Sequence, residues 1–370
     1  MHLFKSVGLV LMVVGLGIAH AAAPNVSRPL TKQEDVAKGY AFFTSHDEIV
    51  TKAKKEGKLR VSANLERSTI KATTAAFKKK YPFLEDVYVA ETTGTEAAQR
   101  MLLALKSGAA EEWDTTHILV AFRSDYSPHL WNVDLLGMAK RGVLQIPPSM
   151  IDQKNRNVVA LCSYFQPTAY NVQLVAPDLV PKTWEDLLRP ELRNRKFALD
   201  IRPKDVAALV PVWGLEKTLD FARKLAAQQP IWVRGSRALT SMVAGEIPMV
   251  VGPNIASVKL TQLKDRTGVA RYVIPEPVPV RFGSAQGILA SSQHRHAALL
   301  WMEWMASPEA QKIVDETEFS SSVHVRGGFV EQELRAKKLS VVDWEHYHDV
   351  ERWEEEVSKA YGFPKVETKK

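Results

Sequence analysis

Arginine side chains recur where the sequence predicts the end of a strand and the start of a helix. Arg67, Arg123 and Arg202 follow three such predicted strands. Arg234 and Arg281 lie close to two others. A guanidinium group forms paired hydrogen bonds with carboxylate or phosphate, and the free amides of a helix start add fixed dipoles that attract anions. This chemistry predicts a site for an organic anion such as a carboxylate, phosphate or phosphonate ester. For each arginine alone, a salt bridge within the protein is the competing interpretation.

The same strand ends carry small polar side chains and an aromatic residue. Residues 92–95 predict a helix N-terminus whose hydroxyl groups either only cap the helix or also contact a ligand. Tyr164 precedes residues 165–167 of a presumed crossing, and it either contacts the ligand or packs in the core. The predicted ligand-binding set is Asn64, Arg67, Ser68, Thr93, Thr95, Arg123, Ser124, Tyr164, Arg202, Asn254 and Ser284.

The sequence contains no motif for catalysis, for a resident metal ion or for a cofactor. It has no Gly-x-Ser-x-Gly sequence, no phosphate-binding P-loop and no dinucleotide-binding fingerprint. The pairs His294 with His296 and His346 with His348 lack a third metal ligand at a useful spacing. The single cysteine, Cys162, lies in an apolar stretch and is predicted to be buried rather than nucleophilic. We therefore expect a binding protein without a cofactor rather than an enzyme.

The N-terminal residues predict export. Lys5 precedes an almost wholly apolar run over residues 7–18, and Ala19 and Ala21 are small residues where a signal peptidase cuts. This run is too short to span a bilayer comfortably, because spanning takes about 20 apolar residues. Residues 1–21 are predicted to be a cleaved signal peptide, without a cysteine at the cut site for lipid attachment. Residues 22–45 are predicted to be a leader on the surface.

The remaining chain has the composition of an ordinary globular protein. Of its 370 residues, 45% are hydrophobic and 25% are charged, which is enough for about two domains. The formal net charge is +7, but basic residues alternate with acidic ones, as over residues 331–338 and 351–359. The charge therefore indicates a solvated surface, and nucleic acid is not an expected partner.

Predicted strands and helices alternate along the chain, first over residues 59–120 and again over residues 158–274. This alternation is typical of doubly wound parallel sheets. The predicted fold class is α/β, with two doubly wound lobes joined by a hinge near residues 163–168 and 276–282. Ligands of such sheets bind beyond the carboxyl ends of the strands, where the predicted polar residues lie.

The expected boundaries make the first lobe discontinuous. It takes residues 46–162 and 283–335, and residues 168–275 make the second lobe. Residues 340–370 are expected to form a C-terminal tail that is helical over residues 340–361. This tail, which contains Trp344 and Trp353, either covers a lobe or offers a surface to a partner.

Several stretches, in their order along the chain, resemble one protein family. They are KKEGKLRV at 54–61, AFKKKYP at 76–82, PKTWEDLL at 181–188, RKFALD at 195–200, VAGE at 243–246 and AALLWMEWMASPEAQ at 297–311. The chain is similar in these stretches to the iron(III)-type, type 2 periplasmic solute-binding proteins of ABC importers (extracellular solute-binding protein family 1). The resemblance covers most of residues 46–316.

The resemblance implies a periplasmic protein that traps a small-molecule solute between two lobes and delivers it to ABC permease subunits in the inner membrane. We expect a monomer. Ferric-binding members carry adjacent tyrosines after a second-lobe strand, whereas residues 251–257 here contain no tyrosine, histidine or carboxylate. An organic anion is therefore the first expectation. The alternatives are ferric iron or an iron complex, and a sensor subunit or exported enzyme on the same two-lobed scaffold.

Overall fold

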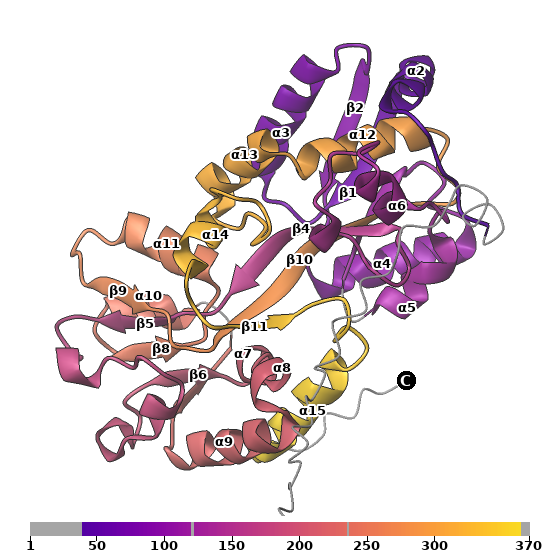
Figure 1. Ribbon diagram of the computed structural model, residues 1–370. Coiled ribbons are helices and arrows are strands. Elements are labelled where there is room, and N and C mark those ends of the chain that lie inside the picture. Colours follow the sequence, from indigo (N-terminus) through magenta and orange to yellow (C-terminus); the bar gives the residue numbers. More distant parts are fainter. Residues whose placement is uncertain (1–38, 120–121, 235–236, 364–370) are drawn as a thin grey trace, which may run out of the picture.

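The structure is a computed structural model that describes residues 39–119, 122–234 and 237–363 of the 370-residue chain. The predicted signal peptide and most of the predicted leader lie outside these residues. The described part forms an elongated molecule in which two sheets with flanking helices are joined by strands that run through the middle (Figure 1). Within the described ranges, every helix is too short or too polar to cross a membrane.

The first lobe is built on a mixed sheet with the strand order β11-β10-β3-β1-β2, in which β4 also pairs with β10. β1 lies parallel to β2 and β3, whereas β10 runs antiparallel to β3 and β4. The strands are β1 (Lys58–Ala63), β2 (Asp86–Glu91), β3 (Thr115–Ile118), β4 (Val158–Phe165), β10 (Val278–Ile288) and β11 (Leu339–Val342).

Helices cover this sheet on its outer sides, and α12 forms the centre of the first core. Every residue of α12 from Ala297 to Met305 is buried, as expected of a helix that is apolar on nearly all its faces. Trp301 packs edge-on against Phe77 of α3, at 5.1 Å between ring centroids. The helices of this part are α2 (His46–Glu56), α3 (Arg67–Lys80), α4 (Gly94–Ser107), α5 (Arg123–Tyr126), α6 (Leu135–Lys140), α12 (Arg295–Met305), α13 (Pro308–Glu318) and α14 (Phe329–Leu334).

The second lobe is built on a sheet with the order β7-β6-β8-β5-β9. β6 lies parallel to β8, so the carboxyl ends of both strands reach the same edge of the sheet. The strands are β5 (Thr168–Asn171), β6 (Ala198–Asp200), β7 (Ile231–Val233), β8 (Met249–Val251) and β9 (Ala270–Val273). The helices are α7 (Lys204–Ala207), α8 (Val210–Trp213), α9 (Leu215–Ala227), α10 (Arg237–Val243) and α11 (Ile255–Lys264).

Two stretches of the second lobe form only short helical segments. The stretch 181–188 forms only a 3-10 turn over Glu185–Leu188. The stretch 206–213 is divided between α7 and α8 at Ala208–Leu209. Pro211 stands at the start of α8, where its missing N–H costs no hydrogen bond, and this position favours the beginning of a new helix.

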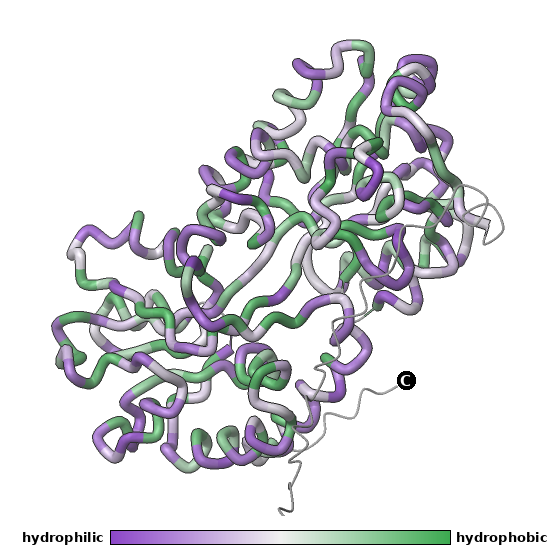
Figure 2. The backbone as a smooth tube through the Cα atoms, viewed as in Figure 1, coloured by the Kyte–Doolittle hydropathy of each residue, from purple (hydrophilic) through white to green (hydrophobic). Residues whose placement is uncertain are grey.

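The chain passes between the lobes from β4 to β5, from β9 to β10 and again along β11. Residues Gln166 and Pro167 link β4 to β5, which is the predicted crossing. β11 lies parallel to the first part of β10, where Val278 pairs with Leu339. Hydrophobic residues line these central strands, whereas hydrophilic residues mark the outer helices and turns (Figure 2).

The predicted helix over residues 340–361 is wrong in its first part. Leu339–Val342 is a strand in which Ser340 and Val342 are buried and their neighbours are half-buried. The β-branched pair Val341 and Val342 favours a strand, and pairing with β10 fixes it. Helix α15 begins only at Val350 and ends at Ala360.

The tail covers the second lobe. The spacing of Val350, Trp353 and Val357 places them on one face of α15. Trp353 and Val357 are buried in the core around β6 and α9, together with Tyr361. Helix α14, which precedes the tail, packs elsewhere: its Val330 and Leu334 are buried in the core near β9 and β10.

Candidate functional site

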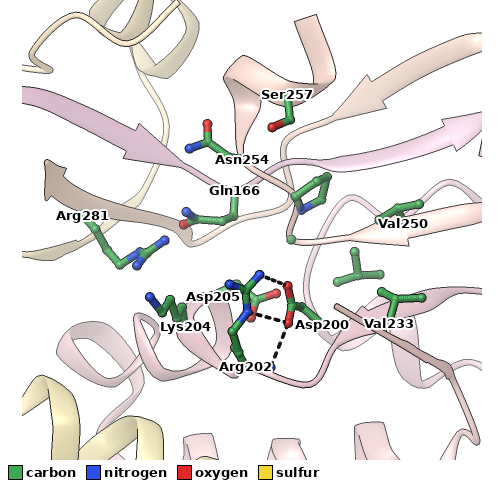
Figure 3. A pocket seen from close by; sticks show the side chains of 13 residues that line it. Gln166, Asp200, Arg202, Lys204, Asp205, Val233, Val250, Asn254, Ser257 and Arg281 are labelled. Carbon is green, nitrogen blue, oxygen red and sulfur yellow. Dashed lines mark hydrogen bonds and ion pairs between the residues drawn. The ribbon is translucent and has the colours of Figure 1, made fainter. Parts of the chain in front are cut away.

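A cavity of about 390 Å³ opens where β6 and β8 end, between the second lobe and the crossing strands (Figure 3). Beyond this edge, β6 is followed by α7 and β8 by α11. Helix starts and side chains from several elements therefore meet there. We call this space the anion pocket. Its lining residues are Gln166, Asp200, Arg202, Lys204, Asp205, Val233, Val250, Val251, Gly252, Pro253, Asn254, Ser257 and Arg281.

Arg281 of β10 reaches into the anion pocket without an acidic partner among the described residues. The side chain is half-buried, and its Nε makes no hydrogen bond with any residue that the structure describes. Its Nη2 donates to the side-chain oxygen of Gln166 over 2.9 Å when the Gln166 amide is oriented to suit its neighbours. Burial lowers the pKa of Arg281 below its ordinary value of 12.5. A desolvated cation of this kind gains most from an anion that enters the pocket.

Lys204 and Arg202 add positive charge to the same pocket, with different pairing. Lys204 makes no ion pair with any described residue; it is exposed, yet the pocket walls desolvate its ammonium group enough to lower its pKa. Arg202 donates from Nη2 to Oδ2 of Asp200 over 2.7 Å and from Nε to Oδ1 over 3.1 Å. Figure 3 shows Arg281, Lys204 and Gln166 around the same space, with the Arg202–Asp200 pair beside them.

Asp205 lies at the base of the pocket and is only 3% exposed. Neither carboxyl oxygen has a hydrogen-bond partner in the described part of the chain. Burial raises the pKa of Asp205 from 3.8 to about 7, so the group is largely uncharged in mildly acidic solution. Gly252 has φ +71 and passes directly over Oδ2 of Asp205. A side chain at position 252 would collide with that carboxyl group, which explains the glycine.

The start of α11 faces the same pocket. Oδ1 of Asn254 accepts a hydrogen bond from the Ala256 amide over 2.9 Å and caps the helix. Asn254 and Ser257 line the pocket, so the positive end of the helix dipole adds to the field of the basic side chains.

A larger cavity of about 470 Å³ adjoins the anion pocket and shares Lys204, Asn254 and Arg281 with it. Most of its lining comes from β3, β4 and β10 and from β11, α15 and the segment between them. Its residues are Asn64, Thr95, His117, Ile118, Leu119, Phe122, Ser124, Tyr164, Lys204, Asn254, Arg281, Phe282, Gly283, Ser284, Ala285, Val342, Asp343, Trp344, Tyr347, His348, Val350, Glu351 and Glu354.

The structure brings most of the predicted site residues to these cavities. Arg202 lines the anion pocket, and Asn254 lines both cavities. The larger cavity is lined by Asn64, Thr95, Ser124, Tyr164 and Ser284. Ser284 Oγ also donates to the carbonyl oxygen of Asn64 over 2.8 Å, which ties β10 to the end of β1.

The other predicted site residues line neither cavity. Arg67 has a side chain that is 92% exposed and pairs with Glu91 over 3.1 Å. Ser68 and Thr93 are exposed, and Thr93 stands at the start of α4 without making a side-chain cap. Arg123 is buried and pairs with Asp152 over 3.0 Å. For Arg67 and Arg123, a salt bridge within the protein is thus what the structure contains.

Several cavity residues were not in the predicted set. Lys204 and Asp205 follow the strand end at Arg202 by two and three residues, so a wider window beyond each strand would have included them. Arg281 had been noted only as near a predicted strand end. Trp344 and Tyr347 carry no local signal, because their place depends on how the tail folds back.

His294 and His296 pair with carboxylates of the protein, and Cys162 is buried. The distance from His294 Nδ1 to Asp114 Oδ1 is 3.1 Å, and that from His296 Nδ1 to Glu56 Oε1 is 2.5 Å. No group of three or more histidine, cysteine, aspartate or glutamate side chains in the described ranges is placed to hold a metal ion. Cys162 is fully buried, as predicted, and burial raises the pKa of its thiol to about 12.

Two α/β lobes joined by crossing strands, with a basic pocket at the strand ends, define the class of two-lobed binding proteins. Residues 150–349 match the family described as bacterial extracellular solute-binding protein, and the chain belongs to this family. The protein is therefore a solute-binding component of ABC import, and its family binds solutes rather than catalysing reactions. Among curated protein sequences, none matches this chain.

Solved structures confirm the predicted fold class. Iron-bound HitA from Pseudomonas aeruginosa is 18% identical, with a TM-score of 0.60 over 81% of this chain and 99% of that chain. IdiA (FutA) from Trichodesmium, in complex with iron and citrate, is 16% identical, with a TM-score of 0.64 over 82% and 99%. A Bordetella ferric binding protein is 14% identical, with a TM-score of 0.65 over 82% and 98%. At these identities the likeness establishes the two-lobed fold.

Proposed function

We propose that the protein captures an organic anion in the anion pocket and delivers it to an ABC permease. The observation that carries this proposal is Arg281, a desolvated guanidinium without an acidic partner among the described residues. Lys204 is a second cation in the same pocket that forms no ion pair within the described part of the chain. A carboxylate, phosphate or phosphonate group between these side chains would gain charge-assisted hydrogen bonds and offset the cost of their desolvation.

The remaining parts of the pocket suit an anion as well. The capped start of α11 supplies a positive dipole end through Asn254 and Ser257. The charge of Arg202 is largely balanced by Asp200. Asp205 and Glu354 are acidic groups near the cations that oppose an anion, and the raised pKa of Asp205 reduces its own opposition below about pH 7.

Closure of the lobes would enclose the ligand. The proposed first lobe comprises residues 46–162 and 283–335, the second comprises residues 168–275, and residues 163–168 and 276–282 form the hinge. Arg281 lies in this hinge and Lys204 in the second lobe, so an anion between them would favour the closed arrangement. The proposed location is the periplasm, after removal of residues 1–21, and the proposed working form is a monomer.

A second candidate ligand is ferric iron bound together with an organic anion. The similar structures named above include an iron-bound protein and one with iron and citrate. Tyr164 and Tyr347 both line the larger cavity here, and phenolate oxygens suit a hard cation. Burial raises the pKa of both phenols, so each is protonated unless a metal displaces the proton. The two candidates share the anion and differ in whether iron is needed.

Isothermal titration with citrate, ferric citrate, phenylphosphonate and a sugar phosphate distinguishes the two candidates. For an organic-anion receptor we expect iron-free anions to bind and Arg281→Met to weaken their binding about 100-fold. Arg67→Met serves as the matched control, because Arg67 is exposed and outside both cavities. Binding of ferric citrate alone would support the iron candidate. Wild-type protein that binds none of these anions, or an Arg281→Met variant that binds them unchanged, would overturn the proposal.

A further inference from the structure

The larger cavity has a wall made by the segment between β11 and α15. Trp344 and Tyr347 of this segment are half-buried, and their rings stack with centroids 6.0 Å apart. Trp344 also contacts Phe282 of β10 edge-on, at 5.6 Å between centroids. We call Trp344, Tyr347 and Phe282 the aromatic wall. It joins the tail to a crossing strand directly beside Arg281.

The side of the cavity that faces β3 carries apolar side chains next to the buried ring of His117. Ile118 is buried at the end of β3, and Leu119 and Phe122 continue this surface. The cavity thus has apolar side chains from the first lobe and aromatic rings from the tail and β10. Its volume of about 470 Å³ falls within the range of roughly 300–1,000 Å³ that is typical of pockets for organic ligands.

Polar atoms in the aromatic wall lack partners. The Trp344 Nε1 and the Tyr347 hydroxyl group are buried, and neither makes a hydrogen bond with the described residues. Buried donors are normally satisfied by protein, by water or by a ligand. Both donors belong to residues that line the cavity, so an acceptor on a bound molecule has candidate donors there.

Acidic groups restrict what the far end of a ligand carries. Glu351 is exposed and lines the larger cavity from the first turn of α15. Glu354, one turn further on, also lines the cavity, but its charge acts on Arg281 and Lys204 and so lies beside the anionic end. Asp343 lines it as well and accepts from the Glu345 amide. A second anionic group at this end would meet these carboxylates. A ligand with one anionic end and an uncharged body fits the distribution of charge.

We propose that the two adjoining cavities form one bipartite site for an organic anion with an apolar or aromatic body. The anionic group lies between Arg281 and Lys204, and the body lies against the aromatic wall. The inference rests on the proposed function, because it needs an anion in the anion pocket. It adds that the tail selects the ligand, so that small oxyanions are poor ligands and aromatic acids are good ones.

Matched pairs of probes test the body separately from the anionic group. The pairs are methanesulfonate with benzenesulfonate, methylphosphonate with phenylphosphonate, and acetate with benzoate. Each pair has one anionic group and differs in the ring. By isothermal titration we expect the ring-bearing member to bind about tenfold or more tightly in the pair that fits best, because an aromatic ring buries a large apolar surface.

Variants of the aromatic wall locate the effect. Trp344→Ala and Tyr347→Ala are expected to reduce the preference for the ring to about twofold or less, while binding of the small member stays unchanged. Because Tyr347→Ala keeps the contact between Trp344 and Phe282, this variant provides the test if Trp344→Ala disturbs the fold of the tail. Tyr88→Ala is the matched control, since Tyr88 is 55% exposed on β2 and outside both cavities.

The outcomes separate this inference from the proposed function. A preference for the ring that both wall variants remove supports the bipartite site. Equal binding of both members of every pair, or a preference that both variants keep, overturns the inference and leaves the anion pocket standing. If wild-type protein bound no member of any pair, the proposed function and the inference would fail together.

Discussion

Two arginines of this protein have opposite surroundings. Arg156, in the first lobe, is buried against Asp134 and forms paired hydrogen bonds of 2.6 Å from Nε and from Nη2. Arg281, at the crossing between the lobes, is half-buried and has no acidic partner among the described residues. Both side chains lose water, but only that of Arg156 is compensated by an opposite charge inside the protein.

The difference separates structural charges from charges available for binding. The Arg156–Asp134 pair joins the start of α6 to the segment before β4, where Asp134 also caps the helix through the Gly137 amide. Removing one partner would leave a buried charge without compensation. Arg281 already lacks an acidic partner among the described residues, and an incoming anion would supply one. Unpaired basic groups in a cavity are therefore better markers of the site than arginines counted along the sequence.

The largest expected effect comes from breaking the buried pair. Asp134→Ala should lower the free energy of unfolding by about 3–5 kcal/mol, because it leaves Arg156 buried without a partner and removes a helix cap. Urea unfolding measures this change. The remaining folded protein should bind benzenesulfonate or phenylphosphonate with unchanged affinity. A large loss of affinity in folded protein would contradict the separation between the two arginines.

Arg281→Met should have the opposite effects, a loss of anion affinity without a loss of stability. We expect anion affinity to fall by about 100-fold, which corresponds to the loss of charge-assisted hydrogen bonds worth about 2.7 kcal/mol. Stability should stay the same or rise, since the variant removes a desolvated charge that lacks a partner. Titration and urea unfolding of the same preparation report both quantities. A variant that unfolds readily but binds normally would assign Arg281 a structural role.

Asp205→Asn tests the opposing charge. Burial raises the pKa of Asp205 from 3.8 to about 7, so between these values the folded protein keeps a proton that the unfolded chain releases. Stability therefore falls as pH rises from about 4 to about 7 and levels off above. Ionised Asp205 also repels an anion, so wild-type affinity for benzenesulfonate should fall about 3- to 10-fold between about pH 6 and pH 8.

Benzenesulfonate keeps its charge over this range, so the change in affinity reports the protein. Asp205→Asn should bind with a much flatter pH dependence and should be more stable than wild type at about pH 8. His348 also lines the larger cavity, but it is present in both wild type and Asp205→Asn. A difference in pH dependence between the two proteins is therefore due to Asp205. An unchanged pH dependence in Asp205→Asn would assign the titration to another group.

The smallest effects concern arginines with partners at the surface. Arg202→Ala should weaken anion binding only about 2- to 5-fold, because the Arg202 side chain is 47% exposed and solvent screens its charge. Arg67→Ala should leave affinity unchanged, since its side chain is 92% exposed and paired with Glu91. Titration of both variants with the same anion measures the difference. A stronger effect from Arg67 than from Arg202 would contradict the assignment of the pocket.

Local patterns were sufficient for much of the fold. The strand Met249–Val251 and the helix after Asn254 rest on local signals, a buried β-branched run and an asparagine cap. The tail strand Leu339–Val342 was missed because it depends on pairing with β10, which lies far away in the sequence. A short strand of this kind carries little signal of its own.

The site was predicted only in its general position. Strand ends indicated Arg202 and Asn254, and both line the anion pocket. The same rule also selected Arg67 and Arg123, and sequence alone does not show that Glu91 and Asp152 neutralise them. Which basic groups remain unpaired is a property of tertiary packing. For this reason the sequence indicated Arg281 only as lying near a strand end, and Lys204 emerged only from the structure.

Native mass spectrometry of protein purified from the periplasm tests the central claim most directly. We predict that wild-type protein carries a bound organic acid, which after release is identified as a molecule with one anionic group. Arg281→Met purified in parallel should lack it. The Arg67→Met variant should retain it. Equal amounts of the same bound mass in wild type and Arg281→Met, or a ligand without an anionic group, would contradict the account.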